Sequence, residues 1–131
     1  AWPLVADADE SWYAKPLSGK LMVSPADKDP VAACDIHPDD MVLAEGLDRF
    51  QRRMNYEVKR VEHSWAGLRS FPVDGESVVG FDGRAEGFFW YAGIGGYGIQ
   101  TSPALSVLAA ELVLGRDATL DTAPFDPNRF A

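Results

Sequence analysis

The chain has 131 residues, 47% of them hydrophobic, and a formal net charge of -8. This length suffices for one domain with a buried core, and the hydrophobic content excludes a disordered chain. The acidic balance argues against nucleic acid or an anionic membrane as partner, and no apolar stretch approaches the length of a membrane span. The single cysteine, Cys34, cannot form an internal disulfide, which favours a reducing, cytoplasmic location.

The first third of the chain predicts a hairpin and a loop. Two strand-like runs, at residues 11–16 and 20–25, are separated by Leu17-Ser18-Gly19, a gap of hairpin length. Residues 25–38 are rich in proline and aspartate and predict a loop. Cys34 and His37 lie in this loop, but two ligands do not make a zinc site.

A helix is predicted from Asp39 or Asp40 to about Met54. Either aspartate can serve as the N-cap, and apolar residues recur at helical spacing from Met41 to Phe50. The acidic start and the basic end of this segment agree with the helix dipole. We therefore expect an amphipathic helix that covers a sheet and turns its arginines to solvent.

A long strand is predicted from about Tyr56 to Phe71, because polar and apolar residues alternate before an apolar, aromatic segment. Gly67 would mark a bulge in this strand. Arg69 stands among apolar and aromatic neighbours, where a guanidinium needs an acceptor and its planar fork suits a carboxylate. A structural ion pair, or a side chain that reaches toward solvent, would explain Arg69 equally well.

A glycine loop joins the best candidate strand to the best candidate helix. Short strands at 77–80 and 88–92 lead to residues 93–100, which read G-I-G-G-Y-G-I-Q. Thr101 or Ser102 is the predicted N-cap of the next helix, with Pro103 at its first position and an apolar body. Glycines let the backbone approach a ligand closely, and the helix N-terminus favours an anion in front of it.

The loop also matches G-x-G-x-x-G, the dinucleotide-binding fingerprint, at Gly93, Gly95 and Gly98. The context argues against a Rossmann unit, because Pro103 delays the helix and no second parallel strand with a terminal acidic residue follows. A glycine loop that only turns the chain stays open as an interpretation. Antiparallel hairpins, a covering helix and a buried C-terminal helix together predict the α+β class.

Several motifs in chain order resemble one enzyme family. They are Tyr13-x-x-Pro16, Trp65-Ala66-Gly67-Leu68-Arg69, Asp74-Gly75, Val79-Gly80, the run from Phe89 to Ala104, and Pro124-Phe125-x-Pro127-x-Arg129-Phe130. This series resembles the flavin-dependent D-amino acid oxidase superfamily, which includes glycine oxidase, sarcosine oxidase and D-amino acid dehydrogenases. The resemblance covers nearly the whole chain but only the C-terminal third or so of such an enzyme.

The resemblance implies a parent enzyme in which FAD takes a hydride from the carbon beside a substrate amine. Residues 1–92 would belong to an antiparallel substrate domain and its return strands, and residues 93–131 would form the glycine loop, a flavin-facing helix and the tail. Arg69 would hold a substrate carboxylate, and Tyr13 would line the same pocket. The residues implied to contact FAD are Gly93, Ile94, Gly95, Gly96, Tyr97, Gly98, Ile99 and Gln100.

Two hypotheses follow. In the first, the chain is a catalytically silent piece of a flavin oxidoreductase, whose partners are a small amino acid or amine and a missing N-terminal FAD-binding half. In the second, it is a binding or interaction module that keeps the fold without the cofactor. The start at Ala1 without Met favours the first, and so we expect an exposed apolar surface at residues 88–91 and 107–114 that drives self-association.

Overall fold

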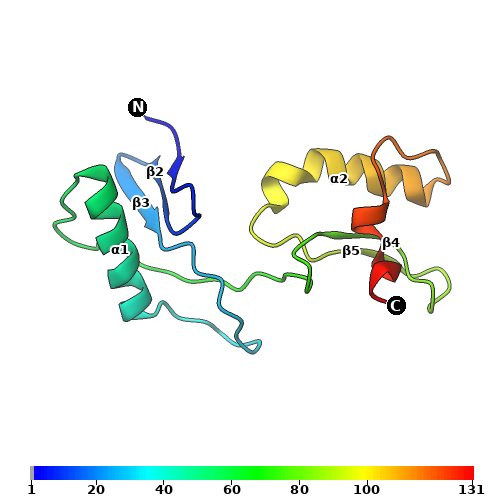
Figure 1. The fold of residues 1–131 in the computed structure, drawn as a ribbon, viewed down its shortest axis with the longest axis horizontal. Coiled ribbons are helices and arrows are strands. Elements are labelled where there is room, and N and C mark those ends of the chain that lie inside the picture. Colours follow the sequence, from blue (N-terminus) through cyan, green and yellow to red (C-terminus); the bar gives the residue numbers. More distant parts are fainter. Residues whose placement is uncertain (1) are drawn as a thin grey trace. The chain divides into compact units, whose positions relative to one another are not determined.

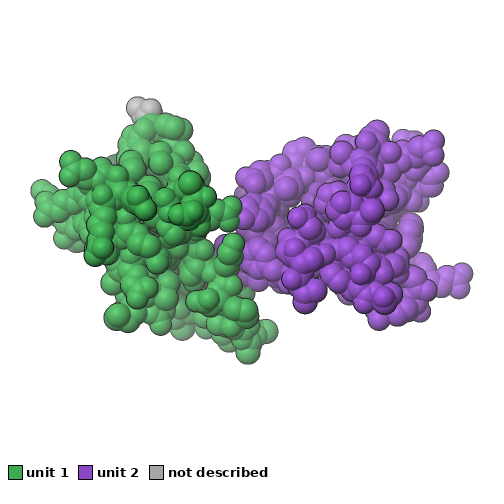
Figure 2. Space-filling view, viewed as in Figure 1, with its two compact units in different colours: residues 1–68 green, residues 69–131 purple. Residues whose placement is uncertain are grey.

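The computed structural model describes residues 2–131, which form two compact units divided between Leu68 and Arg69 (Figure 1, Figure 2). Each unit combines antiparallel strands with an α-helix, so the predicted α+β class is confirmed. None of the helices in residues 2–131 is long and apolar enough to span a bilayer. The boundary between residues 92 and 93 concerns the domains of a longer enzyme and stays a prediction.

The first unit contains a three-stranded antiparallel sheet. Its strands are β1 (Val5–Ala6), β2 (Tyr13–Leu17) and β3 (Lys20–Ser24), in the order β1-β2-β3. Ser18 and Gly19 connect β2 to β3 with φ angles of 50° and 77°. Two positive φ angles match the strand twist of a two-residue hairpin, and the predicted hairpin is confirmed with this shorter turn.

Helix α1 (Asp40–Met54) packs against this sheet, and its predicted N-cap is confirmed. The Asp39 carboxylate accepts hydrogen bonds from the backbone N–H groups of Met41 and Val42, at 2.8 and 3.0 Å. Phe50 is fully buried and meets the Trp12 ring edge-on, with ring centroids 5.4 Å apart.

The predicted apolar face of α1 is partly wrong. Met41 is 69% exposed, whereas the buried residues of α1 are Gly46 and Phe50. Gly46 and Phe50 are four residues apart and share a face, but Met41 lies about 140° around the helix from Gly46. The Cβ of any other residue at position 46 would meet Pro25 at 2.5 Å, so the closest contact of α1 requires a glycine.

The strand predicted from Tyr56 to Phe71 is absent: these residues pair with no strand in the described chain. Alternation favours a strand only where a neighbouring strand takes up its backbone hydrogen bonds. From Val61 to Phe71 every side chain is exposed, so burial does not order the segment either. Near its start, Val58 donates its N–H to Gln51 Oε1 at 2.7 Å and packs at the edge of the first core.

The second unit is a two-stranded sheet covered by a helix. Strands β4 (Val78–Phe81) and β5 (Phe89–Ala92) pair antiparallel, and helix α2 (Gly98–Val113) contributes Leu105 and Leu108 to a core with Val79. The tail forms two 3-10 turns, η1 (Ala123–Phe125) and η2 (Pro127–Phe130), which pack on β4. The predicted irregular segment strapped across a surface is therefore found, with local turns in it.

Helix α2 begins earlier than predicted, at Gly98, and Pro103 lies inside it. Pro103 cannot donate to the carbonyl of Ile99 four residues before it. The Ser102 hydroxyl donates to that carbonyl instead, at 3.0 Å, while the N–H and the hydroxyl of Thr101 both bond to the Tyr97 carbonyl. The Ser102 hydroxyl thus substitutes for the missing Pro103 donor, the Thr101 hydroxyl adds a second bond to a carbonyl that is already paired, and neither residue is the N-cap.

Helix α2 is less buried in this chain than its composition predicts. Leu105 and Leu108 are buried, but Val107, Val113 and Leu114 are 50%, 56% and 60% exposed. Phe88 in the second unit is also 48% exposed. Apolar residues on both expected segments are therefore exposed, and the self-association expected of them stays a prediction.

Candidate functional site

The glycine loop, residues 93–97, runs from the end of β5 to the start of α2. Gly93 and Gly95 have φ angles of 65° and 54°, in the region that favours glycine. The Gly95 N–H donates to the Ser70 carbonyl at 3.1 Å, and the Tyr97 N–H donates to the Ile94 carbonyl at 3.2 Å. The loop is thus held both by its own turn and by the segment that precedes β4.

That preceding segment forms a close-fitting support for the loop, which we call the loop backing (Phe71 and Pro72). A Cβ at Gly93 would lie 2.5 Å from Pro72 Cγ, and a Cβ at Gly95 would overlap the Phe71 ring. Real Cβ atoms do not approach so closely, so the two glycines are required by packing as well as by φ. One side of the loop is filled by its backing.

Arg69 lies against the loop. A Cβ at Gly96 would be 3.3 Å from Arg69 Nη1, and the Arg69 guanidinium carbon is 5.6 Å from the centre of the Phe71 ring. The structure therefore brings the predicted carboxylate-binding arginine and the predicted cofactor loop together, although Arg69 and Gly95 are 26 positions apart in the sequence.

The N-terminus of α2 has no side-chain cap. Tyr97 stands at the N-cap position without a capping hydrogen bond, and the first turn contains no acidic residue. The N–H groups of Gly98, Ile99 and Gln100 have no acceptor within the helix, because intrahelical bonds begin at the next turn. This end is suited to an external acceptor or an anion.

Side chains at the start of α2 lie in two different places. Ile94 folds back onto the helix, where a Cβ at Gly98 would be 2.6 Å from Ile94 Cδ1. Ile99 is 96% exposed, and Tyr97 and Gln100 are exposed too. At the N-terminus of α2, Ile94 therefore covers one side of the helix, and the apolar side chain of Ile99 is exposed.

Tyr13, the second predicted substrate residue, belongs to the first unit. It lies in β2, half-buried and opposite Ser24 of β3. Its place in a site with Arg69 stays a prediction. Across residues 2–131 no group of three or more His, Cys, Asp or Glu side chains is arranged to hold a metal ion, and Cys34 is exposed.

A hollow of about 360 Å³ lies on the second unit, and the loop backing forms part of its wall. Trp90 and Phe130 line it together with Asp82. The Trp90 indole N–H donates to Asp82 Oδ2 at 3.0 Å, and this hydrogen bond holds the pKa of Asp82 below its ordinary value. Phe71 and Pro72 therefore contact the glycine loop and also line this hollow, and Gly93 of the loop lines it with them.

The sequence matches the family model described as FAD dependent oxidoreductase over residues 1–112. The chain belongs to this family of FAD-dependent oxidoreductases. The match includes the loop backing, the glycine loop and most of α2, so the elements just described lie inside the region that defines the family.

Three curated relatives resemble this chain. It is 28% identical to FAD-dependent oxidoreductase domain-containing protein 1 of Bos taurus and of Xenopus laevis, in each case over 98% of the chain. It is 30% identical to glycine oxidase of Geobacillus kaustophilus (strain HTA426) over 93% of the chain. The chain spans 28%, 27% and 32% of the lengths of these three relatives.

The glycine loop of this chain has features that suit the flavin ring. The backing fills one side, so a flat ligand would approach the loop from the side of the α2 N-terminus. Backbone N–H donors at the start of α2 match the oxygen and nitrogen acceptors on the pyrimidine edge of a flavin. Residues 93–100 therefore fit FAD, and their contact with it stays a prediction.

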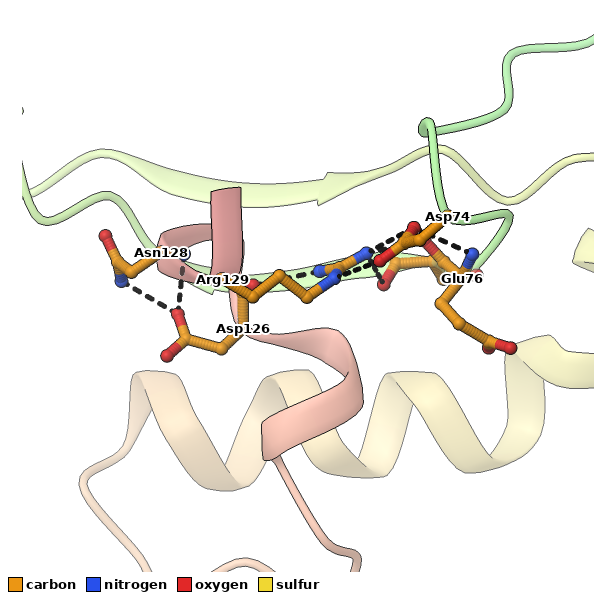
Figure 3. Close-up of polar contacts among 6 residues, drawn as sticks. Asp74, Glu76, Asp126, Asn128 and Arg129 are labelled. Atoms are coloured by element: carbon orange, nitrogen blue, oxygen red, sulfur yellow. Dashed lines mark hydrogen bonds and ion pairs between the residues drawn. The ribbon is translucent and has the colours of Figure 1, made fainter. Parts of the chain in front are cut away.

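Sequence reasoning missed one polar cluster in this chain, which we call the tail clamp (Arg129 and Asp74; Figure 3). Arg129 Nε and Nη2 donate to the two Asp74 carboxylate oxygens at 2.7 and 3.2 Å. Both residues stand in motifs noted in the sequence, but no spacing rule pairs positions 55 residues apart. The sequence did contain one signal for this pair: an arginine in an irregular segment, whose guanidinium needs an acceptor.

Proposed function

We propose that this chain forms part of a flavin-dependent enzyme that oxidises the C–N bond of a small amino acid or amine. The observation that carries this proposal is the position of Arg69 beside Gly96, next to the uncapped N-terminus of α2. A carboxylate-binding group and an acceptor-binding helix end then lie within one unit. Family membership supports flavin dependence, and the similarity to a glycine oxidase supports the substrate class.

In this proposal residues 93–100 line the flavin. When bound, FAD supplies the hydride acceptor for the carbon beside the substrate nitrogen. The α2 N-terminus would stabilise negative charge in front of it by about 0.3–2 kcal/mol. Since about 1.4 kcal/mol corresponds to roughly 30 mV for a two-electron couple, the helix would adjust the flavin potential only modestly.

Arg69 would bind the substrate carboxylate. Its planar guanidinium can donate two parallel hydrogen bonds, which fix both the position and the orientation of a carboxylate. The Phe71 ring limits the movement of the guanidinium on one side, because the guanidinium carbon lies 5.6 Å from the ring centre. Tyr13 would line the same pocket in the assembled enzyme.

The exposed side of α2 would pack against an FAD-binding half outside this chain. Val107, Val113 and Leu114 are at least half exposed, and apolar surface of this kind marks an interface. Without that partner the chain should be inactive, and the same surface should drive its self-association. We place the assembled enzyme in the cytoplasm on the basis of the single cysteine.

The flavin absorbance of a longer protein that carries this chain tests the proposal. We expect a yellow protein whose flavin is bleached under anaerobic conditions by a D-amino acid or an N-methyl amino acid. A colourless protein that stays colourless with added FAD would contradict the enzyme function and favour a binding module without cofactor.

Arg69→Gln tests the substrate role separately. Loss of hydrogen bonds to a charged group costs about 1.5–3 kcal/mol, which raises KM for a carboxylate-bearing substrate by roughly ten- to 100-fold. The flavin spectrum, and turnover of an amine without a carboxylate, should not change. Arg116→Gln is the matched control, because Arg116 is an exposed arginine just beyond the far end of α2. Equal KM values for Arg69→Gln and the parent would remove Arg69 from the substrate site.

A further inference from the structure

Arg129 is held more firmly than an ordinary surface arginine. Its side chain is 15% exposed, and it contacts two separate segments of the second unit. Besides the two bonds to Asp74, Arg129 Nη2 donates to the Glu76 and Ser77 carbonyls at 2.8 and 3.4 Å. Nη1 donates to the Asp126 carbonyl at 2.9 Å, and the guanidinium carbon lies 4.2 Å from the centre of the Phe130 ring.

The tail clamp is joined to the turn at residues 72–75, which begins at Pro72 of the loop backing and precedes β4. This turn is closed by the Gly75 N–H, which donates to the Pro72 carbonyl at 3.0 Å. Asp74 Oδ1 also accepts the Glu76 N–H at 3.1 Å. Asp74 is thus fixed on one side by its own turn and on the other by Arg129 from the tail (Figure 3).

The same turn begins at Pro72, whose ring packs against Gly93. Phe71, one residue earlier, packs against Gly95, and Ser70 accepts the Gly95 N–H. Each of these residues contacts the next directly, so a displacement of the turn changes the position of the residues that pack on the loop. A continuous series of contacts therefore connects Arg129, through the turn and the loop backing, to the glycine loop.

We propose that Arg129 is a positioning residue for the glycine loop, because it fixes the turn at residues 72–75 and thereby the backing against which Gly93 and Gly95 pack. The tail is then a brace that sets the direction of the loop N–H groups and the place of Arg69. The consequence for a flavin rests on the function proposed above. The proposed effect of Arg129 on the loop does not depend on that function.

Arg129→Gln and Arg129→Lys test the inference in the chain itself. Gln removes the charge and the fork, whereas Lys keeps the charge but has all its donors on one nitrogen, so it cannot pair with Asp74 through two nitrogens and also reach the carbonyls. Arg84→Gln is the matched control, because Arg84 is in the same unit, its side chain is 83% exposed, and it pairs with Asp82 at 3.6 Å.

The readout is the set of glycine amide resonances in ¹H–¹⁵N correlation spectra. We expect both Arg129 variants to shift the amides of Gly93 and Gly95, with a larger shift for Gln than for Lys. Gly19, in the first unit, should not move, and Arg84→Gln should leave Gly93 and Gly95 in place. Unchanged loop amides in a folded Arg129 variant would overturn the inference.

Asp74→Asn provides a second route if the Arg129 variants do not fold. Asn keeps an acceptor and the turn bond to Glu76, but it removes the charge that orients the Arg129 fork. The inference requires the same loop amides to shift in Asp74→Asn, and their constancy would overturn it.

The holoprotein separates this inference from the proposed function. If the loop lies on the flavin, Arg129→Lys should also change the visible circular dichroism of the bound flavin, which reports its surroundings. Shifted loop amides with an unchanged flavin signal would confirm the brace and contradict the placement of the loop at the flavin. Unshifted amides would reject the brace, whatever the flavin shows.

Discussion

Helices α1 and α2 are of similar length but differ in their N-caps, in the charges of their end turns and in the burial of their apolar residues. Helix α1 has a side-chain cap at Asp39, an acidic first turn, a basic last turn and a buried Phe50. Helix α2 has no side-chain cap, no acidic residue in its first turn, no basic residue in its last turn and exposed apolar residues such as Val107. Helix α1 is capped and packed by its own chain, whereas α2 has an N-terminus without a side-chain cap and several exposed apolar side chains.

The core contact of α1 gives the largest expected effect. Phe50→Ala should lower the free energy of unfolding by about 3–5 kcal/mol, since a fully buried aromatic side chain is replaced by a cavity. Urea unfolding monitored by circular dichroism measures it. Met41→Ala on the same helix is the control and should change stability by less than about 0.5 kcal/mol, because Met41 is largely exposed. Equal effects of the two changes would mean that Phe50 is not the core residue by which α1 is held.

The loop in front of α2 gives the next largest effect. Gly95→Ala should cost about 1–3 kcal/mol for its positive φ, plus a further loss because the new methyl group would overlap Phe71. Gly115→Ala measures the φ cost alone, since Gly115 also has a positive φ of 64° but has no atom near its would-be Cβ, so the difference between the two variants gives the cost of the overlap with Phe71. Thermal unfolding of both variants measures the two losses of stability. If Gly115→Ala is the more damaging change, the loop backing is not closely packed.

A negative charge in the first turn of α2 tests the difference between its uncapped N-terminus and the capped, acidic N-terminus of α1. Gln100→Glu should stabilise the chain by about 0.3–1 kcal/mol, because an anion at a helix N-terminus is favourable. In a flavin-containing holoprotein the same change should weaken FAD binding and lower the flavin potential, since the carboxylate competes with the ligand. Gln100→Ala is the neutral control. A stabilised holoprotein with unchanged FAD affinity would show that the helix end does not serve the cofactor.

The tail clamp predicts a smaller, pH-dependent effect confined to the second unit. The hydrogen bonds from Arg129 hold the pKa of Asp74 below its ordinary value in the folded state. The clamp therefore stabilises the fold above the ordinary carboxylate pKa of about 3.9, and this contribution is lost as the pH falls through the folded value. Asp74→Asn should remove this part of the acid dependence of thermal unfolding. Arg129→Gln should remove the same part, and the double variant should remove no more.

Local features of the sequence predicted much of this chain. The turn at Ser18 and Gly19, the cap at Asp39 and the strands at β4 and β5 follow from rules that act over a few residues. The start of α2 was predicted too late, because Pro103 is normally a first-turn residue. The sequence offered no rule by which the Ser102 hydroxyl would bond to the Ile99 carbonyl in place of the missing Pro103 N–H.

For the candidate site, the glycine loop and Arg69 could be named from residue types and from the family resemblance. Their closeness could not be predicted, because it depends on Phe71 and Pro72, which look like ordinary turn and core residues in the sequence. The alternation from Tyr56 to Phe71 predicted a wrong strand for a related reason. Alternation indicates which side chains of a strand would share a face, but it does not show whether a partner strand is present to take up the backbone hydrogen bonds.

The sequence by itself determined the α+β class, the family and the helix and turn signals, since these depend on periodicity, capping and glycine conformation within short stretches. The tertiary structure alone decided which glycines are required by packing, where Arg69 lies and that Arg129 in the tail joins Asp74. These contacts join residues that are far apart in the chain, by as many as 55 positions for the tail clamp. Such contacts arise when close packing and charge pairing select partners in space, and no local pattern encodes that choice.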